Sequence, residues 1–322
     1  MIYPPEHGPA ENWIVSTAIS GDYFERWEDG FAALWFDYAK RHDLGIAVAV
    51  EDLYGAGDPP LNGAWQKLLA VDALSRELGR PVRCALIDSD VLISPLAENI
   101  FHAVDAGRIG VVSMVRGTPM EFRRVTNRIA LYRREYIDAS FPLNSLLNAS
   151  PRQVFEWAGL GGAADDFACT GVIVCDSASH GDVFRRWYEE APSDEEYHAI
   201  GDWEQTYVNF QIQQRPDVQW IDYSWQAIWM MEVAVHYPFL YASMVEPEVL
   251  QWCVTSALLK HQFLHLAGRW ETIPDARSIP VLPQIAEMAE FIGRLRTQDQ
   301  ASEPAQMRGK LSPPHIRDSS DV

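Results

Sequence analysis

The sequence predicts an α/β fold in which a mostly parallel sheet carries helices on both faces. Apolar runs of strand length alternate with stretches whose apolar residues recur at helical spacing. The run 82–87 is almost continuously apolar, as expected for a strand that is buried on both faces. With 322 residues, 48% of them hydrophobic, the chain is long enough to bury a sizeable core.

The first part of the chain supplies these elements in regular alternation. The expected strands cover 13–19, 45–53, 82–87 and 109–115. The expected helices between them cover 24–42, 64–78 and 95–104. The loop at 54–62 is rich in Gly and Pro, and Gly79-Arg80-Pro81 is a helix stop.

The second part of the chain contains a less regular segment at 116–162. From Phe122 to Tyr136 apolar residues recur at steps of three and four, which predicts a helix, and five of the other positions are arginine. These arginines either pair with nearby acids or belong to an insertion that binds an acceptor or forms oligomers. Later strands are expected at 167–176 and 218–223, and later helices at 183–190, 201–213 and 282–296.

The domain organisation follows from these elements and from the polar end of the chain. We expect one catalytic domain over 1–296, with the helical insertion at about 116–162. From 297 to 322 the chain is polar and rich in Ser, Pro and Asp, so we expect a disordered tail.

Composition narrows the classes of partner. The net charge is −19 and the pI is about 4.8, which makes nucleic acid and anionic membranes poor partners. An anionic substrate would need a local positive site or a metal. The four cysteines lack metal-ligand spacing, so we expect buried thiols in a reducing compartment. The first residues do not resemble a signal peptide and no apolar run is long enough to span a membrane, so we expect a cytoplasmic protein.

Two carboxylates end the third strand, Asp88 and Asp90. Side chains at i and i+2 of a strand point the same way, so these acids lie roughly 6–7 Å apart. At an effective dielectric of about 20 their repulsion is on the order of 2–3 kcal/mol, which a hard divalent cation would offset. The carboxyl ends of strands are also where α/β sheets bind ligands. The pair therefore indicates a metal site that holds a phosphorylated ligand, with a helix-capping turn as the alternative.

Further short motifs occur in order along the chain. They are Thr17-Ala-Ile-Ser-Gly-Asp-Tyr23, Trp65-Gln-Lys67-Leu, Asp88-Ser-Asp90-Val-Leu92, Phe167-Ala-Cys-Thr-Gly171-Val, Glu204-Gln205-Thr-Tyr-Val-Asn209 and His265-Leu-Ala-Gly268. Taken together, over roughly 13–270, the chain resembles the GT-A glycosyltransferases, and most closely the glycogenin-like retaining branch (glycosyltransferase family eight and its relatives). The family's Asn is absent from the stretch before Gly171, and Glu204 stands where the family has Asp.

The resemblance implies a role for individual residues. The implied metal ligands are Asp88, Asp90 and His265, which would hold Mn²⁺ or Mg²⁺. The implied catalytic residues are Glu204 and Gln205, near the β-face of the sugar. Tyr23 would stack on uracil. The implied donor-binding residues are Thr17, Ala18, Tyr23, Lys67, Asp88, Ser89, Gly171, Gly268 and Arg269, the last in place of the family's Lys.

The resemblance implies transfer of a sugar from a nucleotide-diphosphate sugar to an acceptor hydroxyl, with retention of configuration. A UDP-sugar is the expected donor. A haloacid-dehalogenase-type phosphatase also uses Asp-x-Asp after an apolar strand, but there the motif usually lies near the N-terminus. A sugar-nucleotide pyrophosphorylase would need a Gly-rich basic loop, which 14–21 does not supply. A GT-A protein that binds a nucleotide sugar without turnover is the alternative from another class. The sugar, the acceptor (glycan, protein or small molecule) and the oligomeric state are not encoded in any motif of the sequence.

Overall fold

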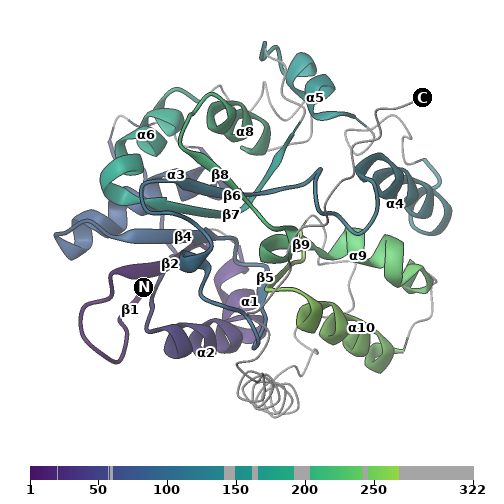
Figure 1. Ribbon diagram of the computed structural model, residues 1–322, viewed down its shortest axis with the longest axis horizontal. Coiled ribbons are helices and arrows are strands. Elements are labelled where there is room, and N and C mark those ends of the chain that lie inside the picture. The colour runs from purple at the N-terminus through teal and green to yellow at the C-terminus, as the bar shows by residue number, and fades with distance from the viewer. Residues whose placement is uncertain are drawn as a thin grey trace, which may run out of the picture.

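The computed structural model describes residues 1–19, 21–56, 58, 61–140, 149–161, 166–191, 204–241 and 246–267. Within these ranges seven strands form a central sheet in the order β1-β3-β2-β4-β7-β6-β8 (Figure 1). The strands are β1 (Ile2–Tyr3), β2 (Asn12–Thr17), β3 (Gly45–Ala49), β4 (Arg83–Ile87), β6 (Ile109–Ser113), β7 (Ala168–Asp176) and β8 (Val218–Ile221).

The central sheet is mixed: five of its seven strands point the same way, as the sequence predicts, but only three of its six strand pairs are parallel. The pairs β3–β2, β2–β4 and β6–β8 are parallel, whereas β1–β3, β4–β7 and β6–β7 are antiparallel. It follows that only β1 and β7 run against the common direction. The reversed β7 lies in the middle of the sheet, where it separates β4 from β6.

Helices cover both faces of this sheet (Figure 1). One face packs against α3 (Gly63–Leu78), α6 (Ser177–Glu189) and α8 (Gln205–Gln213). The core on the other face contains residues of α1 (Tyr23–Gly30) and α2 (Ala32–His42), and it continues into α4 (Phe122–Tyr136), α9 (Trp229–His236) and α10 (Pro247–Lys260). Consecutive residues of β2 divide between the two cores: Trp13 and Val15 join the first, and Ile14 joins the second. The expected α/β architecture is therefore confirmed.

Two helix expectations were wrong. The helix expected at 24–42 is divided into α1 and α2, because the backbone leaves helical geometry at Phe31, whose ring turns into the core. The helix expected at 95–104 contains only a 3-10 turn, Ile100–His102. There the hydroxyl of Tyr38 donates to Glu98 O and accepts from Ile100 N, so a side chain satisfies backbone groups that a helix would pair internally.

A second, small sheet lies beside the first. It joins β5 (Val91–Ile93), β10 (Phe263–His265) and β9 (Ala227–Ile228) in the order β5-β10-β9. Strand β10 pairs antiparallel with β5 and parallel with β9. The sequence did not predict β5, because three residues are too few to show a periodic pattern.

Strand β7 carries an irregularity that matters for the site. Opposite β6, the partner of Val111 is Ile173, but the partner of the next residue, Val112, is Cys169. The intervening residues 170–172 are therefore extra on β7, which is a bulge. On its other side β7 still pairs with β4, up to Ile87 opposite Val172. Residues 170–172 of β7 therefore have no ladder partner among the described residues of β6, and they lie beside the end of β4.

Several expectations fall outside the described residues. They concern the start of the helix at 201–213, the helix at 282–296, the tail from 297, and Gly268 and Arg269. Within the segment 116–162 the expected helix is present as α4, and α5 (Pro151–Trp157) follows it. All four cysteines are free and buried, as expected. Among the helices described here, none combines the length and the apolar character needed to cross a membrane.

Candidate active site

Asp88, Asp90 and His265 meet at the edge where the two sheets adjoin. Each offers a ligand atom, and these atoms all lie within 4.8 Å of one another. His265 Nε2 lies 3.1 Å from Asp90 Oδ1 and 3.9 Å from Asp88 Oδ2. The grouping that the sequence motifs imply is therefore present in space, although Asp90 and His265 lie far apart in the chain.

Backbone pairing places these three side chains. Asp88 follows β4 directly, and its N–H donates to Gly171 O in the β7 bulge over 2.9 Å. His265 ends β10 and lies opposite Val91 of β5, while Leu266 N donates to Asp90 O over 3.1 Å. The register of the small sheet is therefore what brings the histidine to the aspartates.

The charges of the three groups are strongly coupled. Burial raises the pKa of Asp88 above its usual value, and the positive charges of Lys67 and His265 only partly oppose this. Burial also acts to raise the pKa of Asp90, but the charge and hydrogen bond of His265 outweigh it and lower that pKa. Burial would lower the pKa of His265, yet Asp90 raises it well above its usual value. The nearby carboxylates therefore favour the protonated, positively charged form of the His265 imidazole.

This donor set fits a divalent cation. Carboxylate oxygens are the ligands that Mg²⁺ and Mn²⁺ prefer, and an imidazole nitrogen shifts the preference toward transition metals such as Mn²⁺. Asp88 has an oxygen to spare for a cation, because Lys67 binds Oδ1 whereas Oδ2 faces His265. Each of the three residues offers one ligand atom, and the three atoms lie close enough together to bind one cation.

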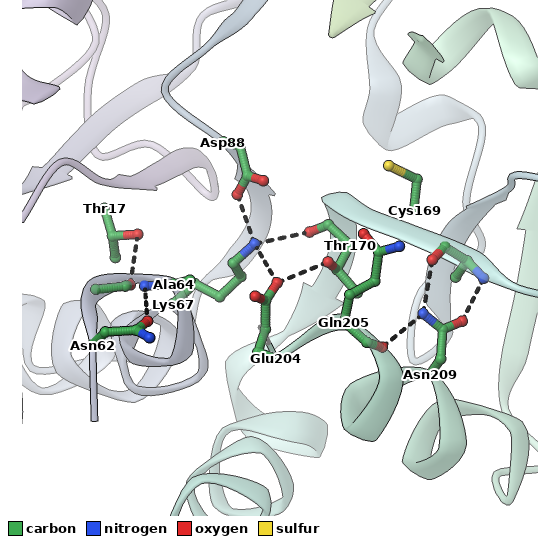
Figure 2. A network of polar contacts seen from close by, with 12 residues as sticks. Thr17, Asn62, Ala64, Lys67, Asp88, Cys169, Thr170, Glu204, Gln205 and Asn209 are labelled. Atoms are coloured by element: carbon green, nitrogen blue, oxygen red, sulfur yellow. Dashed lines mark hydrogen bonds and ion pairs between the residues drawn. The ribbon is translucent and has the colours of Figure 1, made fainter. Parts of the chain in front are cut away.

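Lys67 of α3 joins Asp88 to Glu204 (Figure 2). Its Nζ lies 2.7 Å from Asp88 Oδ1, 2.9 Å from Glu204 Oε1 and 3.3 Å from Thr170 O. An ammonium group has three donors, so these three acceptors match its full capacity. Burial would lower the pKa of Lys67, but Asp88 and Glu204 outweigh it and raise that pKa. Lys67 therefore stays charged and holds the two carboxylates in place.

The β7 bulge completes this network. Thr170 contributes its carbonyl to Lys67 and its hydroxyl to Glu204, with Oγ1 donating to Oε1 over 2.8 Å. Gly171 also leaves space that neighbouring side chains fill. A Cβ there would lie 2.3 Å from His265 Cε1 and 2.5 Å from Gln226 Nε2, closer than any real contact. The glycine lets His265 pack directly on the bulge.

The two predicted catalytic residues stand at the start of α8. Glu204 is buried and bound to Lys67 and Thr170, whereas Gln205 is partly buried and its Nε2 contacts Met114 Sδ at 3.4 Å. One turn later Asn209 brackets Ala168 at the start of β7. Its Nδ2 donates to Ala168 O over 2.8 Å and its Oδ1 accepts from Ala168 N (Figure 2). Asn209 thus fixes α8, and with it Glu204 and Gln205, against the bulged strand.

The expected donor-binding residues of the first strand lie next to this network. Thr17 ends β2, a parallel neighbour of β4, and its Oγ1 donates to Gly63 O at the start of α3 over 3.4 Å. Ala18 continues the strand edge, since its N–H donates to Ala49 O. Tyr23 begins α1 with 45% of its surface exposed, and Ser89 is buried between the two aspartates in sequence. Only Gly268 and Arg269 cannot be placed, because both lie outside the described residues.

Three further residues belong to the site, although no pattern in the sequence indicates their roles. Thr170 and Cys169 lie inside a recognised strand, where they read as core, and Gln226 lies in an aromatic-rich stretch without a motif. Gln226 Nε2 contacts both His265 Nδ1 and Cys169 Sγ at 2.9 Å. Their importance arises from the bulge and from the β9–β10 pairing, for which no local signal exists.

Comparisons with known proteins give a limited result. No protein-family model matches the sequence, and no curated protein matches it. Among solved structures, a glycosyltransferase involved in glycosylation of the major capsid of PBCV-1 is 12% identical with a TM-score of 0.43, covering 88% of this chain and 100% of that chain. The galactosyltransferase LgtC, in complex with donor and acceptor sugar analogs, is 14% identical with a TM-score of 0.41, covering 87% and 95%. The bifunctional glycosyltransferase WbbM is 9% identical with a TM-score of 0.43, covering 89% and 52%. Likenesses this distant leave the activity to be inferred from the residues of the site.

Proposed function

We propose that this chain is a metal-dependent GT-A glycosyltransferase of the glycogenin-like type, which moves a sugar from a UDP-sugar to an acceptor hydroxyl. The observation that carries the proposal is the convergence of Asp88, Asp90 and His265 within 4.8 Å, beside the buried Lys67–Glu204 pair. Lone acidic clusters are common, but here a histidine from a distant strand completes the set. The order of motifs along the chain supports the same activity.

The proposed cofactor is Mn²⁺ or Mg²⁺, held by Asp88, Asp90 and His265. Bound there, the cation would supply Lewis-acid neutralisation of charge on the departing diphosphate. Lys67 fixes the orientation of Asp88 through Oδ1 and adds positive charge at the same edge of the sheet. Arg269 and the Gly268 backbone are proposed to contact the diphosphate as well.

The reacting sugar is proposed to lie against Glu204 and Gln205. In the transfer, the bond from the sugar's anomeric carbon to the diphosphate oxygen breaks and a bond to the acceptor oxygen forms, while the acceptor proton leaves with the diphosphate. Glu204 is bound to Lys67 and Thr170 through Oε1, which holds the N-terminus of α8 toward the site. Gln205, whose side chain is less constrained, is the better placed of the two to support positive charge at the anomeric carbon. We propose retention of configuration.

The nucleotide is proposed to bind along the ends of β2 and β4. Tyr23, with its exposed ring, would stack on the uracil, and Thr17, Ala18 and Ser89 would line the ribose and phosphate positions. Gly171 contributes by keeping His265 in place. The four free, buried thiols support a reducing compartment, so we propose that the enzyme acts in the cytoplasm.

A nucleotide-sugar-binding protein without turnover is the second candidate. The observation that favours it is the buried, doubly bound Oε1 of Glu204, which resembles a structural ion pair more than a free catalytic carboxylate. Donor binding without nucleotide release would distinguish the two.

Nucleotide release from a panel of nucleotide sugars tests the proposal. We expect slow hydrolysis of one UDP-sugar with Mn²⁺, abolished by a chelator and by Asp90→Asn. The matched control is Asp37→Asn, which removes a carboxylate from the outer surface of α2 and is expected to leave release unchanged. Metal-dependent UDP binding would favour the binding protein if no nucleotide sugar releases its nucleotide, whether or not an acceptor is supplied. If the chain neither binds UDP nor releases nucleotide from any sugar donor, the proposed site is contradicted.

A further inference from the structure

A buried carboxamide closes on His265 from the side away from the aspartates. Gln226 has no exposed surface, and its Nε2 lies 2.9 Å from His265 Nδ1. Its Oε1 is buried and has no hydrogen-bond partner among the residues that the structure describes. An unpaired buried carbonyl oxygen costs about 1–3 kcal/mol, so this arrangement calls for a compensating role.

The surroundings of Nδ1 are tightly packed. Gly171 packs against both the imidazole and the carboxamide, so closely that an added Cβ would lie 2.7 Å from Nδ1 and 2.5 Å from Gln226 Nε2. The buried thiol of Cys169 lies 3.7 Å from Nδ1. Within the described ranges these are the polar side chains that Nδ1 meets, so the carboxamide of Gln226 decides which hydrogen bond Nδ1 makes.

The two ring nitrogens of His265 have linked roles. A neutral imidazole carries one N–H, so an Nε2 that gives its lone pair to a cation requires the proton on Nδ1. With the amide nitrogen facing Nδ1, the proton belongs on Nε2, 3.1 Å from Asp90 Oδ1. That orientation suits a histidine that does not bind metal. A proton on Nδ1 needs an acceptor instead, and a doubly protonated ring has the same need.

We propose that Gln226 is a positioning residue for the metal centre: its carboxamide turns so that Oε1 accepts from Nδ1–H, which fixes the form of His265 whose Nε2 binds the cation. The two ends of a carboxamide are nearly the same size, so the turn exchanges Oε1 and Nε2 without moving the backbone. It gives the unpaired Oε1 a donor, and the Cys169 thiol stands close enough to donate to it as well. This inference rests on the proposed metal site and extends it by one residue.

Manganese affinity of the full chain, measured by calorimetry with UDP present, tests the inference. Gln226→Met keeps the length of the side chain but removes the acceptor, and we expect the Kd for Mn²⁺ to rise about 10–100-fold. Gln226→Glu restores an acceptor, and we expect it to bind within about threefold of the wild type or tighter. A residue that only fills space would give the reverse order, with Met tolerated and Glu damaging, and that result would overturn the proposal.

A matched control separates loss of this contact from loss of any buried amide. Gln66 of α3 is equally buried, and its Oε1 accepts from Leu53 N over 2.7 Å, away from His265. We expect Gln66→Met to lower stability but to leave the Kd within about threefold of the wild type, since it lacks contact with a metal ligand.

The outcomes also distinguish the two levels of proposal. If the wild-type chain does not bind Mn²⁺, the metal site fails and the role of Gln226 fails with it. If the wild type binds and Gln226→Met binds equally well, only the role of Gln226 is overturned. Should Gln226→Met not fold, ¹⁵N NMR of His265 in the wild type with Mg²⁺ bound serves instead: a proton on Nδ1 supports the proposal and a proton on Nε2 contradicts it.

Discussion

Replacing Lys67 by Met should destabilise the folded protein strongly. The substitution keeps the apolar stem of the side chain and removes only the ammonium group. In the wild type, Nζ lies 2.9 Å from Glu204 Oε1, and the two side chains are 7% and 6% exposed. The variant therefore leaves a carboxylate buried without its cation.

The expected cost follows from the burial of this pair. Removing one partner of a buried ion pair typically costs about 3–5 kcal/mol, because the remaining charge has lost its solvent and its counter-charge. We assign this range to the pair with Glu204 alone, since Asp88 is partly solvated and can regain water. The pKa of Lys67 is raised in the folded state, so its contribution is complete at neutral pH and is lost only as the pH rises through that value.

Urea unfolding at pH 7 measures this cost, and two further variants interpret it. The double variant Lys67→Met/Glu204→Gln should recover much of the loss, because neither partner then leaves a buried charge. Lys40→Met removes the lysine of an exposed pair with Glu6, where the side chains are 69% and 60% exposed, and should cost less than about 1 kcal/mol. If Lys67→Met unfolds within about 1 kcal/mol of the wild type, Lys67 is solvated and the network described here is incorrect.

The remaining predictions concern the bulge, the helix behind it and pH. Gly171→Ala should cost about 1–3 kcal/mol in urea unfolding and weaken Mn²⁺ binding, since its Cβ would strike His265; unchanged affinity would contradict that packing. Asn209→Leu removes the side-chain carboxamide that binds the N–H and carbonyl of Ala168, and it should lower the free energy of unfolding by at least about 1–3 kcal/mol. A neutral effect would mean that α8 is held by other contacts. Mn²⁺ affinity should fall as the pH is lowered, because the raised pKa of His265 makes the proton compete with the metal; calorimetry in buffers of different ionisation enthalpy should detect proton release, and a pH-independent Kd would exclude His265 as a ligand.

The sequence predicts the parts of this molecule whose signals are local. Strand β4 and the pair Asp88 and Asp90 are recognisable because an apolar run and two acids at i and i+2 are adjacent in the chain. The sheet with helices on both faces follows from the same alternation. The direction of β7 does not, because its apolar pattern is the same whether it runs with β4 or against it.

The rest depends on contacts between distant residues. Strands β5 and β9 are too short to be periodic, yet their pairing with β10 brings His265 to Asp90. The bulge at 170–172 is visible only as a change of register against β6. Gln226 lies 39 residues before His265 and carries no motif, so its contact with Nδ1 could not be foreseen.

Direct counting of bound Mn²⁺ by electron paramagnetic resonance, with UDP present, tests the metal centre most closely. The wild-type chain should bind about one Mn²⁺ tightly, and both Asp90→Asn and His265→Gln should lose it while Asp37→Asn keeps it. A wild type that binds no Mn²⁺, or variants of Asp90 and His265 that retain it unchanged, would contradict the metal site from which the proposed sugar transfer is inferred.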